Sequence, residues 1–301
     1  MTENKDSISI KDCTLCPRNC GADRTVAQGR CGGGGSARIA RAALHQWEEP
    51  CISGTRGSGT VFFSGCPLGC CFCQNSTISA RNDGKDISIQ RLADIFLELQ
   101  EAGAHNINLV SPTQYVPWIA NALNRVKAQL TIPVVYNTGG YERVVTLRQL
   151  EGLVDIYLPD LKFKSVELAT KYCNAPDYFE TATAAILEMF RQVGPLQYDD
   201  TGLLRRGLLI RHLVLPAGRR DSAEVLEWIG EHLPPSEILI SLMSQYTPYE
   251  ALPYKELNRR ISTYEYQSVV DKALELGLDG FMQERSSAKE EYTPPFDCTG
   301  V

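Results

Sequence analysis

The sequence predicts an α/β fold, a partial (β/α)6 barrel preceded by a small cysteine-rich module. Three observations lead to this fold class. From residue 60 onward, short apolar runs alternate with longer amphipathic segments, the pattern of parallel strands joined by helices. These runs give about six strong strands and a weaker seventh, fewer than the eight of a closed barrel. Residues 1–58 instead hold a group of cysteines and a run of four glycines. A flat, doubly wound sheet is the alternative, and in either architecture ligands bind at the carboxyl ends of the strands.

The first part of the chain, residues 1–58, is expected to form a loop-rich, metal-binding module. Its glycine stretches, "GGGG" and "SGTRGSGT", look too irregular for a helix or a sheet core. Neither ends in the Gly-Lys-Ser/Thr of a phosphate-binding P-loop, so we interpret them as turns or linkers. Residues 59–301 are expected to form the barrel with a C-terminal extension.

The elements of the barrel follow in order along the chain. The first strand, "TVFF", precedes "SIQRLADIFLELQEAG", in which Leu92, Ile95, Phe96 and Leu99 recur at helical spacing before a Gly that can end the helix. Later strands are also apolar runs, most of them followed by amphipathic segments. The expected pairs are "NINLV" with "YVPWIANALNRVKAQ", "IPVVYN" with "RVVTLRQLEGL", "VDIYL" with "DYFETATAAILEMFRQV", "GLLIRHLVL" with "SAEVLEWIGEHL", and "EILISLM" with "TYEYQSVVDKALELG". The weak seventh strand is "DGFM", and prolines in the tail "EEYTPPFDCTGV" argue against a helix there.

Composition and charge narrow the classes of function. The formal net charge of -6 argues against nucleic-acid binding, which depends on an excess of Lys and Arg. The N-terminal "MTENKDSISIKDC" has no apolar signal core, and no segment has the apolar length needed to span a membrane. We therefore expect a cytoplasmic, monomeric protein without a membrane or nucleic-acid partner.

The chain has 11 cysteines, and in a reducing compartment clustered cysteines indicate metal or redox chemistry rather than disulfides. One cluster lies in "FFSGCPLGCCFCQN", directly after the first strand and so at the mouth of the sheet. Cys66, Cys70 and Cys73 supply three thiolates, which can hold three corners of a [4Fe–4S] cubane and leave the fourth iron open. Cys71 adjoins its neighbours too closely to reach a separate corner, and we expect it not to be a ligand. Zinc is the alternative, but a second pair at zinc-like spacing is missing near this loop.

The other cluster lies in the N-terminal module. Cys13, Cys16, Cys20 and Cys31 supply enough thiolates for a closed tetrahedral site, which fits either zinc or a second iron–sulfur cluster. We expect the nearby His45 and Cys51 to pack this module against the barrel mouth, and Cys173 and Cys298 stand alone in the sequence.

The cysteine loop resembles the radical S-adenosylmethionine (SAM) superfamily. The signature of that superfamily, Cys-x3-Cys-x-aromatic-Cys, is met by Cys66, Cys70, Phe72 and Cys73. The continuation Gln74-Asn75 is similar to the branch with pyruvate formate-lyase activating enzymes. The likeness covers much of the chain, through "CTLCPRNCG", "WEEPCISGTRGSGTVFFSGC", "GAHNINLVSPTQYVP", "YNTGGYE", "VDIYLPDLK", "RHLVLP" and "SLMSQYTP", all similar to the pyruvate formate-lyase activating enzyme-like group.

The resemblance implies an oxidoreductase with a [4Fe–4S] cluster and SAM as cofactors. The methionine part of SAM would chelate the open iron, and one electron from a reductant such as flavodoxin or ferredoxin would give methionine and a 5′-deoxyadenosyl radical. That radical would abstract a hydrogen atom, with a glycine of a partner glycyl-radical enzyme as the expected substrate. The alternatives are radical chemistry on a small molecule or a ribosomal peptide, and a non-catalytic iron–sulfur or zinc binding module.

The resemblance also implies a set of cofactor contacts beside the catalytic Cys66, Cys70 and Cys73. Phe72 would lie against the adenine. A lysine in Asp-x-Lys would meet the methionine carboxylate while the aspartate organises it. The remaining expected contacts are Asn75, Thr113, Asn137, Thr138, Arg211 and Gln245, and the Asp-x-Lys pair is Asp160 with Lys162.

The chain departs from the superfamily pattern after the second strand. A Gly-Gly-Glu that often receives the cofactor amino group is replaced by Ser111-Pro112-Thr113, so that Thr113 or backbone carbonyls must serve. We interpret "TGGYE", one strand later, as a turn. His212 is equally well explained as a structural histidine.

Overall fold

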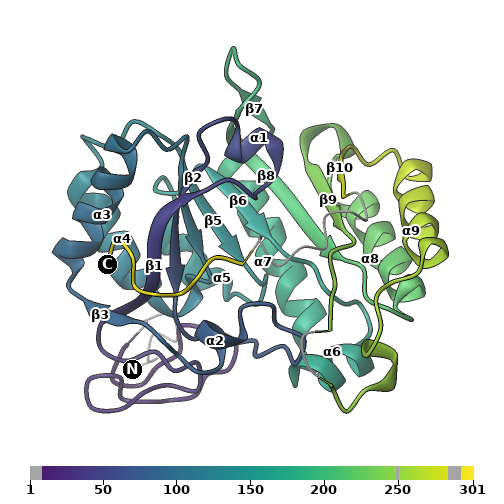
Figure 1. The fold of residues 1–301 in the computed structure, drawn as a ribbon, viewed down its shortest axis with the longest axis horizontal. Coiled ribbons are helices and arrows are strands. Elements are labelled where there is room, and N and C mark those ends of the chain that lie inside the picture. The colour runs from purple at the N-terminus through teal and green to yellow at the C-terminus, as the bar shows by residue number, and fades with distance from the viewer. Residues whose placement is uncertain (1–8, 249–250, 284–292) are drawn as a thin grey trace, which may run out of the picture.

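A computed structural model describes residues 9–248, 251–283 and 293–301 (Figure 1). A ten-stranded sheet runs in the order β10-β9-β8-β6-β5-β4-β2-β1-β3, with β7 paired to β8. Neighbouring strands from β2 to β10 are parallel, whereas β1, β3 and β7 pair in antiparallel fashion. The strands are β1 Ala37–His45, β2 Ser58–Phe63, β3 Lys85–Ile87, β4 Ile107–Val110, β5 Val134–Thr138, β6 Ile156–Pro159, β7 Gln197–Tyr198, β8 Leu204–Leu213, β9 Leu239–Met243 and β10 Gly280–Met282. The predicted α/β class with a mostly parallel sheet is confirmed, and "DGFM" is the short strand β10.

The central strands are buried on both faces. Every residue of β2, β4, β5 and β6 is buried, as expected for parallel strands covered on both sides. Alternate residues separate two layers of apolar side chains. Tyr136 and Tyr157 belong to the large core on one face, and Val135 and Ile156 belong to a smaller core on the other. The sheet therefore has an outer, helix-covered face and an inner face.

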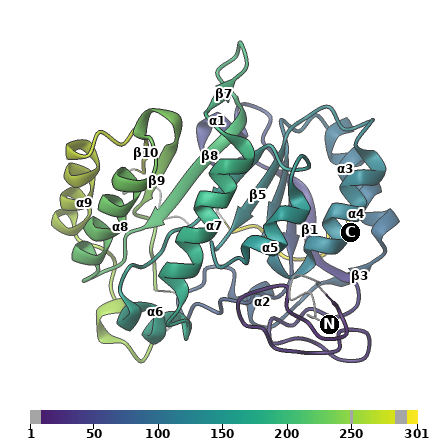
Figure 2. The ribbon, with the colours of Figure 1, turned by 180° about the vertical axis from the view of Figure 1, so that it is seen from behind.

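The longer helices follow the parallel strands and cover the outer face, as Figure 2 shows for α3, α4 and α7. The apolar side chains at helical spacing in the first predicted helix are buried in α3, which Ser88 caps. The helices are α1 Pro50–Ser53, α2 Ser76–Ser79, α3 Ile89–Glu101, α4 Val116–Val126, α5 Val144–Leu147, α6 Val166–Cys173, α7 Tyr178–Val193, α8 Arg219–His232 and α9 Thr263–Glu275, with 3-10 turns at Thr113–Tyr115, Arg148–Leu150, Pro235–Glu237 and Lys255–Leu257. None of the described helices is long and apolar enough to cross a membrane.

The N-terminal part is less irregular than the sequence suggested. The sequence predicted a loop-rich module, but Ala37–His45 form strand β1, which pairs with β2 from Ile39 onward and with β3 at its start. The physical reason is the spacing of buried residues in "ARIARAALH", where Ala37, Ile39 and Ala42 turn apolar side chains into the core. The boundary at residue 58 stays a prediction, and the sheet runs through it.

The cysteine-rich loops before β1 and the C-terminal tail both fold onto the barrel. The loops lie at the carboxyl ends of the strands (Figure 1), where the backbone amide of Cys66 donates to the carbonyl of Cys31 at 3.0 Å. The described tail, residues 293–301, crosses the inner side and bonds to β1 through Cys298 and Thr299. Its Phe296 packs edge-on against Phe62 with 5.4 Å between ring centroids.

Candidate active site

The loop at residues 64–75, here called the cluster loop, brings three of its cysteines to one pocket at the end of β2. Cys66, Cys70 and Cys73 line this pocket and are partly buried. Cys71 is exposed, and its backbone amide donates to the carbonyl of Tyr172 at 2.9 Å. The structure therefore separates Cys71 from the three spaced thiols, as we expect of a residue that is not a ligand.

The three thiols lie within electrostatic reach of one another and of a cation. Burial raises the pKa of Cys66 to about 12, and Cys70 and Cys73 add to the rise. The pKa of Cys73 is raised by burial and by Cys70, whereas Lys162 lowers it. A bound metal centre supplies the positive charge that buried thiolates need.

The donor set fits an iron–sulfur cluster in its chemistry. Three thiols from one short loop match the thiolate ligation of such clusters. In the described part of the chain, no three His, Cys, Asp or Glu side chains are grouped so that they could hold a metal ion. The fit therefore rests on the identity of the donors and on the cationic wall that they face.

A buried ion network forms that wall. Arg211 on β8 donates from Nε to Asp160 Oδ1 at 3.0 Å, from Nη1 to Glu48 Oε2 at 3.2 Å and from Nη2 to Asn137 Oδ1 at 2.6 Å. Lys162 donates to the other oxygen of Asp160. Burial opposes ionisation of Asp160, yet Lys162 and Arg211 lower its pKa. These charges are therefore fixed beside the cluster loop by mutual pairing.

Most of the residues that the sequence predicts as cofactor contacts line the pocket that holds the three cysteines. This pocket, here called the cofactor cavity, has a volume of about 230 Å³. They come from the cluster loop and from the carboxyl ends of β5, β6, β8 and β9, where a parallel sheet places ligands. They are Phe72, Asn75, Asn137, Thr138, Asp160, Lys162, Arg211 and Gln245. Sequence reasoning missed other members of the lining: Trp47, Glu48, Gln74, Ser111, Tyr246 and Thr247.

Thr113 is the exception among the predicted cofactor residues. It is buried, it is not among the residues that line the cavity, and its hydroxyl donates to Glu142 Oε1 at 2.5 Å. Thr138 donates to the same oxygen at 2.5 Å. Burial raises the pKa of Glu142 to about 7, although both hydroxyls lower it. "TGGYE" is a turn, as predicted, with Gly140 at a φ of 79°, but its glutamate also ties two strand ends together.

Two functional candidates carried weak sequence signals. Glu48, in the "WEEP" segment before α1, reaches the inner face and accepts from Asn108 at 2.8 Å as well as from Arg211. Cys173, the last residue of α6, lies with its sulfur 3.3 Å from the sulfur of Cys70. In the sequence, Glu48 is only a polar residue in a loop and Cys173 only an isolated cysteine. Their partners lie far away along the chain, so no local pattern marks either residue as part of the site.

The N-terminal cysteines lie close together beside the cluster loop. Cys13, Cys16 and Cys31 are buried and Cys20 is exposed. Burial raises the pKa of Cys16 to about 12, and Cys31 and Cys13 add to it. The backbone amide of Gly33 donates to the Cys31 sulfur at 3.4 Å. Burial raises the pKa of Cys20, but hydrogen bonds, one of them with Cys13, lower it below its usual value, so all four thiols lie near one another, although in the described residues no three of them are grouped closely enough to hold a metal ion.

The remaining predicted residues have other surroundings. His45 lines the cofactor cavity and meets Phe62 edge-on, with 5.7 Å between ring centroids. Cys51, in α1, belongs to the small inner core, so the prediction that it packs the module against the barrel mouth is wrong: α1 carries it toward the amino ends of the strands instead. His212 is buried, with its ring nitrogens 2.6 Å from a backbone carbonyl and 2.8 Å from the Ser222 hydroxyl, which explains it as a structural histidine.

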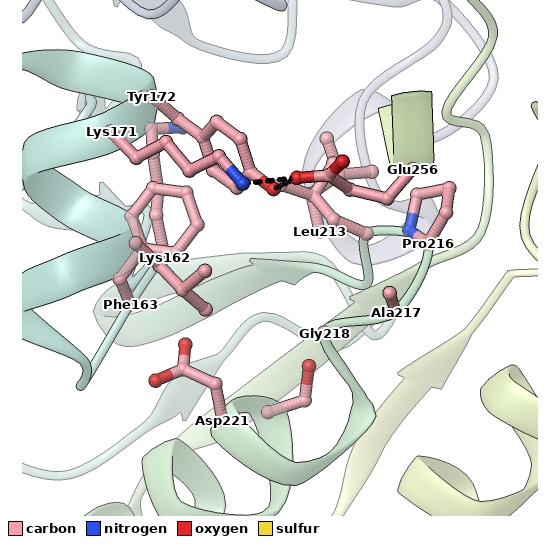
Figure 3. A pocket seen from close by; sticks show the side chains of 13 residues that line it. Lys162, Phe163, Lys171, Tyr172, Leu213, Pro216, Ala217, Gly218, Asp221 and Glu256 are labelled. Atoms are coloured by element: carbon pink, nitrogen blue, oxygen red, sulfur yellow. Dashed lines mark hydrogen bonds and ion pairs between the residues drawn. The ribbon is translucent and has the colours of Figure 1, made fainter. Parts of the chain in front are cut away.

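A second cavity of about 200 Å³ adjoins the first (Figure 3). Lys162 and Leu213 line both. At one side of it, Lys171 and Tyr172 of α6 both donate to the carboxylate of Glu256, and the three side chains converge in Figure 3. The carboxyl ends of β6 and β8 thus border two adjacent chambers.

Comparisons with known proteins identify relatives of this chain. A family model described as "Radical SAM superfamily" matches residues 60–195. The uncharacterized protein MJ0674 of Methanocaldococcus jannaschii is 30% identical over 283 residues, which cover 89% of this chain and 74% of that protein. Among solved structures, Streptococcus suis SuiB bound to S-adenosylmethionine has a TM-score of 0.49 and 14% identity over 73% of this chain and 48% of SuiB. Methylornithine synthase (PylB) has a TM-score of 0.47 and 16% identity over 81% of this chain and 72% of that one. The chain therefore spans about half the length of SuiB.

Proposed function

The chain contains a radical SAM superfamily domain at residues 60–195, and on that premise we propose that Cys66, Cys70 and Cys73 hold a [4Fe–4S] cluster whose open iron binds SAM. The observation that carries this proposal is the meeting of the cluster loop with the ion network of Asp160 and Lys162 in one cavity. The superfamily domain supports the enzymatic activity and both cofactors, and the residue assignments are our proposal.

When bound, the two cofactors supply one-electron chemistry that yields a carbon radical able to take a hydrogen atom from a substrate. The protein itself binds SAM, orients it and shields the radical from water. We assign Lys162 to the carboxylate of SAM, because it is a cation on the cavity wall whose orientation is fixed by Asp160. Arg211 and Glu48 hold that aspartate from the other side, so that the charge pattern is set before the ligand binds.

The other lining residues suit the nucleoside part. Phe72 is assigned to the adenine, and its ring lies among the aromatic rings of Phe163, Tyr172 and Tyr246. Asn137 and Thr138, at the end of β5, are assigned to the ribose or carboxylate region. Asn75 and Gln245 complete the predicted contacts. Such a lining keeps water from a reactive centre.

The substrate proposed first is a glycine of a partner glycyl-radical enzyme, with flavodoxin or ferredoxin as the electron donor. A protein loop needs access from outside, and the sheet is open, with β10 at one edge and β3 at the other. Trp47, on the lining of the cofactor cavity, has 52% of its surface exposed, so part of this lining faces solvent.

A small molecule or a peptide side chain is the second candidate substrate. It is favoured by the chamber of Figure 3, which shares Lys162 with the cofactor cavity and has polar groups converging at one side. A non-catalytic iron–sulfur or zinc module is the outcome if the cofactor does not bind.

We also propose that Cys13, Cys16, Cys20 and Cys31 hold a second metal centre, either zinc or iron–sulfur. Two observations support this second centre. Cys31 and Cys13 lie close enough to Cys16 to add to the rise in its pKa that burial causes, and the amide of Gly33 donates to the Cys31 sulfur, a contact that stabilises a thiolate.

The test is an anaerobic assay of the reconstituted protein with SAM and a strong reductant, scored for 5′-deoxyadenosine. Wild-type protein and Cys71→Ala are expected to produce it, and Cys70→Ala is not. Iron, sulfide and zinc are counted on the same samples, and about eight rather than four irons per chain would assign an iron–sulfur cluster to the N-terminal cysteines. A loaded cluster that neither binds SAM nor forms product would refute the catalytic proposal.

A further inference from the structure

Cys173 is a fourth thiol at the cluster loop, although it lies far from that loop in sequence. It ends α6, only 2% of its surface is exposed, and its sulfur lies 3.3 Å from the sulfur of Cys70. Cys71, the adjacent cysteine within the loop, is exposed instead. The thiol in contact with Cys70 is therefore set by tertiary packing and not by the sequence motif.

Arg18, from the N-terminal cysteine-rich module, joins α6 to the cluster loop. Its Nη2 donates to the Cys173 carbonyl at 2.8 Å and to the Leu68 carbonyl at 3.0 Å, and its Nε donates to the Pro67 carbonyl at 2.8 Å. Its Nη1 donates to the carbonyl of Asn174. One guanidinium thus binds carbonyls on both segments, which fixes their spacing.

Two further contacts hold the end of α6 in place. The amide of Cys71 donates to the Tyr172 carbonyl at 2.9 Å, a direct backbone link between loop and helix. The Tyr172 hydroxyl donates to Glu256 at 2.6 Å, and the dashed line in Figure 3 marks this contact. Three sets of contacts, from Arg18, Cys71 and Glu256, therefore hold the end of α6 that carries Cys173.

We propose that the Cys173 thiol donates a hydrogen bond to the cluster-bound sulfur of Cys70, that Arg18 positions it there, and that this hydrogen bond raises the reduction potential of the cluster. The inference rests on the proposed function, in which Cys70 is a ligand. A metal-bound thiolate carries no proton, so the hydrogen in the contact comes from Cys173. Reduction adds negative charge to the cluster sulfurs, so a donor to one of them favours the reduced state.

The alternative role for Cys173 is that of a fourth iron ligand. Ligands of different irons in a cubane stand apart on separate corners, whereas the sulfurs of Cys70 and Cys173 are in contact. The geometry therefore places Cys173 against the sulfur of a ligand and not on the open iron of the cluster. That iron stays free to bind SAM.

The test is a redox titration of the reconstituted cluster followed by electron paramagnetic resonance, at matched iron and sulfide content. Cys173→Ala is expected to lower the midpoint potential. Cys173→Ser, which keeps a donor, is expected to restore most of the loss, and Cys71→Ala serves as the matched control with an unchanged potential. Arg18→Gln is expected to lower the potential with every cysteine still present.

The outcomes separate the hypotheses. An unchanged potential in Cys173→Ala overturns the inference, and so does loss of the cluster in both Cys173 variants, which would make this residue a ligand. If Cys173→Ala does not fold, Arg18→Gln decides, since an unchanged potential there also refutes the positioning role. These measurements need no turnover, so failure of the inference is distinct from absence of 5′-deoxyadenosine.

Discussion

Replacing Glu142 by glutamine should change how the stability of this protein depends on pH. The carboxyl group is buried, and its Oε1 accepts hydrogen bonds from Thr113 and Thr138. Its Oε2 is buried, and burial raises the pKa of Glu142 by more than the nearby Tyr136 hydroxyl lowers it. An ionised carboxylate here is poorly solvated, and burial raises the pKa of Glu142 from 4.5 to about 7.

The sign of the effect follows from proton linkage. Because the folded protein binds this proton more tightly than the unfolded chain, the stabilisation is complete below about pH 4.5 and is lost as the pH rises through about 7. The difference between the two pKa values, at roughly 1.36 kcal/mol per pKa unit, corresponds to about 3 kcal/mol. The groups that face Glu142 include the phenols of Tyr136 and Tyr157, whose pKa values burial raises, so they stay protonated across this range.

The assay is urea unfolding of wild-type and Glu142→Gln protein at about pH 4.5 and pH 8, with equal metal content. Glutamine stays neutral, so the variant should gain up to about 3 kcal/mol relative to wild type between the two pH values. The exposed Glu180→Gln is the matched control, expected to follow the wild-type profile. If the difference between Glu142→Gln and wild type is the same at both pH values, the carboxyl group does not titrate as argued.

Three further predictions concern the cluster loop and its cavity. Lys162→Gln should weaken SAM binding at least about tenfold in equilibrium dialysis, because a charge-assisted hydrogen bond is lost, whereas the half-exposed Lys171→Gln should not. In iron-free protein, glutathione disulfide should oxidise Cys70 and Cys173 to a disulfide, because their sulfurs are in contact, and should itself be reduced to two glutathione thiols. Peptide mass spectrometry measures the products. If it shows only glutathione adducts, the contact between the two sulfurs is contradicted. Gly65→Ala should lower the free energy of unfolding by roughly 1–3 kcal/mol, because φ is 81° and the added methyl group would lie 2.1 Å from a backbone carbonyl oxygen of the cysteine-rich module.

Gly69→Ala is the control for the last prediction. Gly69 also has a positive φ, of 67°, but no atom within 4 Å of an added methyl group. The two variants share backbone strain and differ in the clash, so an equal loss of unfolding free energy in both would mean that the contact with the module is unimportant.

Much of the fold was predictable because its determinants are local. The alternation of apolar runs and amphipathic segments identified the parallel strands, including β10. The resemblance to the superfamily implied that Asp160, Lys162 and Arg211 contact the cofactor, and in the structure they line one cavity with the cysteines at the carboxyl ends of the strands. Strand β1 was missed, because "ARIARAALH" has no continuous apolar run and no strict alternation, and its pairing with β2 depends on a partner elsewhere in the chain.

The sequence by itself determined the resemblance to the superfamily, the three spaced thiols and the succession of parallel strands along the chain, because motif spacing and hydrophobic period are properties of neighbouring residues. Only the tertiary structure decided which distant groups complete the site. It brought Glu48 to Arg211 across the inner face, engaged Thr113 with Glu142 outside the cofactor cavity, and set Cys173 rather than Cys71 against Cys70. Contacts of this kind arise where separate elements pack together, and no local pattern records which side chains will meet there.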